Sequence, residues 1–179
     1  MKLCAVQVVF TFSILMIGLS SFAQTIRFEP SSGVLAEGEE REIVILVDIS
    51  PQVATSVRAV FTLSDGLEIM GAAQVTNPPW NIPFVNPDGS RIEVNAGDTS
   101  GAGCTSCELA RFTVRNTGTA STAIDFDQTE TRANSPSNQR ILFLTFVDAQ
   151  FQGGASECDT DGIPDGSDNC PCDDNPDQA

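Results

Sequence analysis

The chain contains no histidine and no tyrosine, and its only tryptophan is Trp80. Because histidine is the commonest metal ligand and the usual general base at neutral pH, its absence argues against transition-metal centres and hydrolase triads. Basic residues are also scarce: nine lysines and arginines stand against 24 acidic residues, a formal net charge of −15. Nucleic-acid binding needs a basic patch. Nucleic acid is therefore not an expected partner, whereas cations are.

The chain has one long apolar run, and it lies near the N-terminus. This run, Val6 to Leu19, follows the positive charge of Lys2 and precedes Ser21-Phe22-Ala23, which offers small residues at positions −3 and −1 of a cleavage site. It is short for a transmembrane helix. We therefore expect residues 1–23 to be a secretory signal peptide. The mature chain, from Gln24, is expected at the cell surface or in the medium, without a membrane span.

No stretch between Thr25 and Phe151 shows a convincing helical periodicity. Short β-branched or alternating runs are instead separated by Gly, Pro, Asn and Asp turns, which predicts an all-β sandwich. The expected strands are 25–29, 42–49, 56–63, 67–72, 91–95, 108–115, 121–126 and 140–146, with 147–151 as a candidate continuation after a bulge. Residues 30–33 are expected to form a turn, and Gly153 to Ser156 a hinge.

Residues 77–89 differ from their surroundings because they hold four prolines, which predicts an irregular loop. Trp80 and Phe84 lie close together in this loop. Sugar-binding sites on sandwiches use flat aromatic platforms, so these two residues are candidates for a carbohydrate-binding site. The favoured role of Trp80 is nevertheless a buried loop anchor, because large aromatic side chains usually pack inward.

Several acidic residues of the sandwich raise the question of catalysis. Glycoside hydrolysis needs only two carboxylates, and Glu93, Asp98 and Asp125 are available. Nothing in their spacing pairs them, and surface acids are expected on an acidic exported domain. The sequence therefore predicts that the chain is not an enzyme.

Five cysteines follow the apolar run, at positions 104, 107, 158, 170 and 172. Export favours disulfides, and an odd number leaves one thiol free, paired between chains, or paired with a segment beyond this sequence. Cys104 and Cys107 form a C-x-x-C that is expected to be a local loop staple, since no histidine or second C-x-x-C supports zinc. Cys158 and Cys170 are expected to pair, with Cys172 as the odd thiol.

An acidic stretch near the C-terminus, E-C-D-T-D-G-I-P-D-G-S-D-N-C from Glu157 to Cys170, has the spacing of a calcium loop. Counted from Glu157, carboxylates stand at positions 1, 3, 5, 9 and 12 and a glycine at position 6, as in EF-hand loops. The alternative is an acidic, solvated tail, but so many carboxylates without a cation would repel one another. The expected Ca²⁺ ligands are Glu157, Asp159, Asp161, Asp165, Asp168 and the backbone carbonyl of Ile163.

The run D-T-D-G-I-P-D-G-S-D-N-C-P, followed by N-P-D-Q, resembles a thrombospondin type 3 repeat over Glu157 to Gln178. The resemblance implies a calcium-loaded, disulfide-stapled segment with little hydrophobic core. Two positions depart from the family: Glu157 stands where Asp is usual, and Cys172 where a non-cysteine residue is usual. The sequence stops where the next D-x-D-x-D-G would begin, so residues 157–179 are expected to be a fragment of a longer array or one incomplete unit.

Residues 24–152 are expected to form one domain, and a second resemblance covers most of Thr25 to Phe151. The opening T-I-R-F-E-P-S-S-G-V-L-A-E-G-E, then I-V-I-L-V-D and V-R-A-V-F-T-L, and later E-L-A-R-F-T-V-R-N-T-G-T-A-S-T-A-I-D-F, are similar to a cohesin domain. The resemblance implies a jelly-roll β-sandwich related in fold to cellulose-binding modules, with cysteines at 104 and 107 that are unusual for the family. It also implies a non-catalytic binding or adhesion module for a dockerin-like or surface protein. The alternative is a carbohydrate-binding module attached to a polysaccharide-degrading system.

Overall fold

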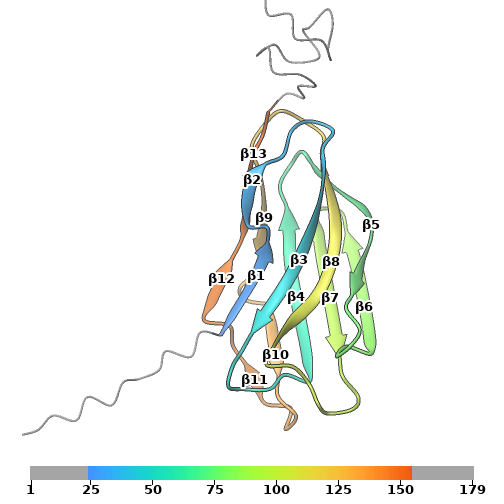
Figure 1. The fold of residues 1–179 in the computed structure, drawn as a ribbon, viewed down its shortest axis with the longest axis vertical. Coiled ribbons are helices and arrows are strands. Elements are labelled where there is room, and N and C mark those ends of the chain that lie inside the picture. The colour runs from blue at the N-terminus through green and yellow to red at the C-terminus, as the bar shows by residue number, and fades with distance from the viewer. Residues whose placement is uncertain (1–23, 155–179) are drawn as a thin grey trace, which may run out of the picture.

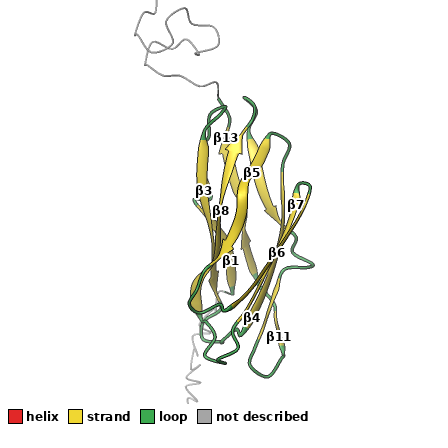
Figure 2. Cartoon of the chain, turned by 90° about the vertical axis from the view of Figure 1, so that its right-hand side faces the viewer, coloured by secondary structure: helices red, strands yellow, loops and turns green. Residues whose placement is uncertain are grey.

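The computed structural model describes residues 24–154, which form thirteen strands and no helix. Two sheets pack face to face in a jelly-roll β-sandwich (Figure 1). Turned by 90°, Figure 2 separates the two layers, with β1, β3, β8 and β5 on one side and β4, β6, β7 and β11 on the other. Among the described residues, no helix is long and apolar enough to cross a membrane.

Each sheet follows a simple order. The five-stranded sheet consists of β12 (Thr145–Val147), β1 (Thr25–Glu29), β3 (Glu40–Asp48), β8 (Ser106–Asn116) and β5 (Leu67–Val75). The eight-stranded sheet consists of β11 (Arg140–Ile141), β10 (Arg132–Asn134), β4 (Ser56–Leu63), β9 (Thr122–Phe126), β13 (Ala149–Gln152) and β2 (Ser32–Val34), with β7 (Arg91–Gly97) and β6 (Ile82–Asp88). Strands β10 and β9 pair with successive parts of β4, and β7 pairs along the other side of β4. The chain therefore places β6, β7, β4 and β10 side by side.

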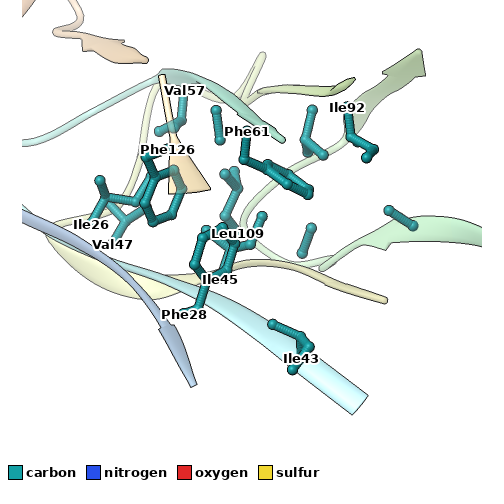
Figure 3. Packing of buried hydrophobic residues seen from close by; sticks show 14 of the residues in the cluster. Ile26, Phe28, Ile43, Ile45, Val47, Val57, Phe61, Ile92, Leu109 and Phe126 are labelled. Atoms are coloured by element: carbon teal, nitrogen blue, oxygen red, sulfur yellow. The ribbon is translucent and has the colours of Figure 1, made fainter. Parts of the chain in front are cut away.

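The core lies between the sheets and follows the alternation read from the sequence. In β4, the inward residues Val57, Ala59, Phe61 and Leu63 are buried, as expected. Phe28 of β1 stacks on Phe126 of β9 at a centroid distance of 4.0 Å and meets the edge of Phe61 at 5.3 Å (Figure 3). Each such pair stabilises a core by about 0.5–1.5 kcal/mol beyond the burial of its area. Aromatic contacts thus join the two sheets.

The prediction of an irregular loop over residues 77–89 is wrong, because residues 82–88 form strand β6. Proline cannot donate to a ladder and is confined to edge strands. Strand β6 is such an edge, since it pairs only with β7. Pro83 and Pro87 stand four residues apart, so their nitrogens lie on the same side of the strand, directed to the open edge. The prolines thus identify an edge strand.

The prediction of one strand over residues 140–146 is also wrong. Residues 140–141 form β11 in the eight-stranded sheet, whereas residues 145–147 form β12 in the five-stranded sheet. The segment between them crosses from one layer to the other, and Phe143 fills the core there against Phe146, with ring centroids 6.1 Å apart. Residues 147–151 do not continue that strand, because β13 returns to the eight-stranded sheet. The expected turn at residues 30–33 contains the start of β2.

Candidate protein-binding face

The outer face of β6, β7 and β4 is built by strict alternation along each strand. In β7, Ile92, Val94 and Ala96 point into the core, so Arg91 and Glu93 lie on the outer side with Asn95. The register aligns outer residues into rows across the sheet. One row runs from Phe84 on β6 through Asn95 on β7 to Arg58 on β4. We call this surface, from β6 to β4, the outer face.

Ion pairs connect the middle of the outer face. The Arg58 guanidinium donates to Glu93 Oε2 at 2.9 Å and to Glu130 Oε2 at 2.7 Å. Arg91 Nη2 donates to Glu130 Oε1 at 3.1 Å, and Asn95 donates to Glu93 Oε1 at 2.7 Å. The side chains of Arg58 and Glu93 are only 25% and 17% exposed. Four charged groups therefore form one half-buried network.

Hydrogen bonding stabilises the ionised form of Glu93. The bond from Asn95 holds the pKa of the Glu93 carboxyl below its ordinary value, and Arg58 and Arg91 act in the same direction. Partial burial opposes them but does not outweigh them. The lowered pKa keeps Glu93 ionised to a lower pH than an ordinary glutamate, and its oxygens are already engaged by protein donors.

An apolar strip borders this network on β6. Ile82 and Phe84 are each 54% exposed, although large hydrophobic side chains are usually covered. The register places Phe84 opposite Asn95 and Ile82 opposite Gly97, so both lie on the outer face. Exposed aromatic side chains beside arginines are characteristic of protein–protein interfaces. The outer face thus has the composition of a protein-binding surface.

Trp80 takes the predicted role of a buried anchor. It is 1% exposed, and its indole Nε1 donates to the Glu108 carbonyl of β8 at 3.0 Å. This bond fixes the segment that leads into β6. A buried indole cannot stack on a sugar ring, so the carbohydrate hypothesis loses its strongest residue, and Phe84 remains as an isolated exposed ring.

The C-x-x-C loop is a local staple, as predicted. Cys104 and Cys107 form a disulfide with a Cα–Cα distance of 6.1 Å. Asp98 organises the same loop, because its carboxylate accepts hydrogen bonds from Gly103 N, Ser100 N and Ser100 Oγ. The bonds from Gly103 and then Ser100 lower the pKa of Asp98. Gly103 has φ of +62°, and a side chain there would collide with the backbone of Ala54.

The three carboxylates considered for catalysis have separate environments. Glu93 belongs to the ion-pair network and Asp98 to the disulfide loop. Asp125 lies on β9, where partial burial, followed by the charge of Asp148, raises its pKa. Within residues 24–154, no group of three or more cysteines and acids is arranged to hold a metal ion.

Other predicted sites lie outside the described residues. They are the signal peptide at 1–23, the candidate calcium ligands (Glu157, Asp159, Asp161, Ile163, Asp165, Asp168) and the cysteines Cys158, Cys170 and Cys172. The first part of the expected hinge is described, and there the Gly154 carbonyl accepts a hydrogen bond from Glu37 N at 2.9 Å.

The fold is that of solved cohesin domains. A non-cellulosomal cohesin from the archaeon Archaeoglobus fulgidus superposes with a TM-score of 0.61 and 16% identity, over 74% of this chain and 91% of that one. A cohesin from Clostridium thermocellum, solved in a type I cohesin–dockerin complex, gives a TM-score of 0.57 and 16% identity over 74% of this chain and 95% of that one. A cohesin from Clostridium acetobutylicum superposes with a TM-score of 0.59 and 11% sequence identity, over 75% of this chain and 94% of that one.

No protein-family model and no curated protein matches the chain. At these identities the solved structures establish the architecture alone. The sequence resemblance over residues 24–152 and the structural likeness therefore agree on a cohesin-like jelly roll.

Proposed function

We propose that this chain is an exported, non-catalytic binding module whose partner is a dockerin-like protein held by the outer face. The observation that carries the proposal is the pairing of exposed Ile82 and Phe84 with the half-buried network around Arg58. A partner that covers the apolar strip gains hydrophobic free energy, and the network offers fixed polar groups for orientation. The Clostridium thermocellum relative in fold was solved bound to a dockerin, which supports a protein partner.

The binding test uses a panel of purified dockerins, immobilised, with the mature chain in solution. We expect Phe84→Ala to weaken binding by about ten-fold or more, as is typical when an interface aromatic is truncated. Arg115→Ala, on the outer side of the five-stranded sheet, is the matched control and should leave binding unchanged. Equal losses in both variants, or binding to cellulose but to no dockerin, would contradict the proposal.

The C-terminal part of the proposal is a calcium-binding repeat of the thrombospondin type 3 kind over residues 157–179. Its support is the spacing of Glu157, Asp159 and Asp161 ahead of Gly162, together with the flanking cysteines. Flexible carboxylates suit Ca²⁺ better than octahedral Mg²⁺, and extracellular sites of this type bind at about 10⁻⁴ to 10⁻³ M. Calcium would then be present on the module only outside the cell.

Calorimetric titration of the mature, oxidised chain tests this part. Asp161→Ala should cost more calcium affinity than Asp177→Ala, because Asp161 is a central ligand in the expected set and Asp177 lies beyond the loop. Equal calcium affinities of the two variants, or no heat of binding in millimolar calcium, would contradict the calcium site and favour the alternative of an acidic, solvated tail. This outcome is independent of the dockerin test, since the outer face lies within residues 24–154.

A further inference from the structure

The eight-stranded sheet ends in three strands, and two of these edges are blocked against further pairing. Pro83 and Pro87 remove backbone donors from β6. At β2, Arg41 Nη2 donates to the Val34 carbonyl at 3.1 Å, so a side chain occupies part of that edge. Natural sheets use such devices because an open edge recruits another strand. The third edge is β11 and the residues that follow it.

The β11 edge carries free backbone groups. Ser135 N donates to the Gln139 carbonyl at 2.9 Å in the turn between β10 and β11. Hydrogen-bonded pairs alternate along an antiparallel ladder, so Ile141 is the next residue bonded to β10, opposite Ala133. The N–H and C=O groups of Arg140 therefore point to the open edge, and β11 ends at Ile141. Among the described residues, Leu142 and Phe143 make no backbone hydrogen bond outside the strands, whereas Leu144 N donates to the Gln24 carbonyl at 2.8 Å.

The side chains along this edge alternate as in a strand. Ile141 and Phe143 are buried, whereas Arg140, Leu142 and Leu144 are exposed. Leu142 is 53% exposed and Leu144 is 71% exposed, the largest value among the exposed large hydrophobic residues that the structure describes. The result is an exposed series of one cation and two leucines at alternate positions.

The cations here have no carboxylate partner within the described part of the chain. Six of the eight arginines form ion pairs there, but Arg132 and Arg140 do not. Arg132 donates to the Glu130 carbonyl at 3.2 Å, and Arg140 to the Thr129 carbonyl at 3.3 Å. Both stand out as positive positions on a strongly acidic chain.

We propose that the Arg140–Leu144 edge binds an extended acidic–apolar peptide segment by strand addition. The open backbone groups of Arg140, followed by the unbonded backbone groups of Leu142, pair with the backbone of the incoming segment, as in other sheet-edge complexes. A carboxylate of that segment faces Arg140, with Arg132 nearby on the next strand, and apolar side chains at alternate positions cover Leu142 and Leu144. This edge lies on the β11 side of the sheet, and the β6 strip lies on the other (Figure 1).

Fluorescence anisotropy tests the proposal with the mature chain and two labelled peptides, Glu-Thr-Leu-Thr-Leu and its reverse, each capped and flanked by threonine. We expect one order to bind and a version with lysine in place of glutamate to fail. Methylation of alternate backbone nitrogens should abolish binding for one set of positions, because strand addition needs those donors.

Substitutions in the chain test whether the peptide binds at the Arg140–Leu144 edge. Arg140→Glu should weaken binding of the acidic peptide about ten-fold, a change of about 1.4 kcal/mol, and should restore binding of the lysine peptide. Leu142→Thr with Leu144→Thr should weaken binding of the acidic peptide, while an unchanged thermal melt shows that the fold is intact. Ile82→Thr with Phe84→Thr, at the edge blocked by prolines, is the matched control and should leave binding of the acidic peptide unchanged, although it should weaken dockerin binding.

In the peptide experiments, three results would overturn the proposal: no peptide binding at millimolar concentration, insensitivity to backbone methylation, or equal losses in the control. Sedimentation of the chain alone tests whether a second copy of the chain occupies this edge. A dimer that Leu142→Thr dissociates would show that a second copy, and not an acidic peptide, occupies this edge. These readouts are separate from dockerin binding, so either proposal can fail alone.

Discussion

The outer surfaces of the two sheets are made from the same residue types and differ in how these are used. On the five-stranded sheet, arginines and glutamates pair across strands in the open, as in Arg111–Glu42, whose side chains are 44% and 56% exposed at 3.3 Å. On the eight-stranded sheet, the network around Arg58 is half-buried. Exposed ion pairs contribute about 0–1 kcal/mol to folding stability. The outer surface of the five-stranded sheet is therefore interpreted as an ordinary solvated surface.

The apolar residues follow the same division. The large hydrophobic side chains that the structure describes as exposed are Val34, Ile82, Phe84, Leu142 and Leu144. The first four lie on strands of the eight-stranded sheet or directly after its edge strand β11, whereas Leu144 directly precedes β12 of the five-stranded sheet. Burial and exposure of particular side chains, rather than overall composition, therefore separate the proposed binding surface from the solvated one.

The largest expected effect is on stability and concerns the core, where both sheets should contribute equally although their outer surfaces differ. Phe28→Ala on the five-stranded sheet and Phe126→Ala on the eight-stranded sheet should each destabilise the domain by about 3–5 kcal/mol. Because the two rings stack at 4.0 Å, the double variant should lose less than the sum of the two. Urea unfolding followed by circular dichroism measures this. Additive losses would contradict a shared core.

The next largest effect is a difference in stability cost between arginine substitutions on the two outer surfaces. Arg58→Ala should cost about 1.5–3 kcal/mol, because it removes the half-buried donor that both Glu93 and Glu130 share and leaves only Arg91 beside them. Arg115→Ala, which removes an exposed pair with Glu40 on the other sheet, should cost less than about 1 kcal/mol. Equal costs in urea unfolding would remove the distinction between the two surfaces.

A smaller effect concerns pH. The pKa of Glu93 is lowered on folding, so its contribution to stability is present above its unfolded pKa, near 4.5, and is lost as pH falls through the folded value. Glu93→Gln should therefore flatten the loss of stability below about pH 4.5. Thermal melts between pH 3 and pH 7 check this, and an unchanged slope would contradict the role given to Asn95 and Arg58.

The smallest effect has the opposite sign. Folding raises the pKa of Asp125, so ionised Asp125 opposes folding above its unfolded pKa, near 3.8, and the penalty fades as pH falls. Asp125→Asn should stabilise the domain slightly at neutral pH and make no difference well below that value. A loss of stability at pH 7 would show that Asp125 has a favourable partner.

The sequence predicted features that depend on neighbouring residues. Strand β4 was predicted with its observed bounds, because alternation alone marks Ser56–Leu63, and the Cys104–Cys107 staple needs only three residues of separation. Strand β6 was missed because its prolines look like a loop until an edge position makes them acceptable. The ion pair of Arg58 with Glu130 joins residues 72 apart, so it follows from strand register and not from any local pattern.

The most direct test of the central claim is hydrogen exchange of the mature chain, with and without a bound dockerin from the panel. The outer face should be covered, so amides of β6 and β7 and of the β4 segment around Arg58 should gain protection, while β3 and β5 remain unchanged. Protection confined to β3, β8 and β5 would place the partner on the solvated sheet and contradict the claim.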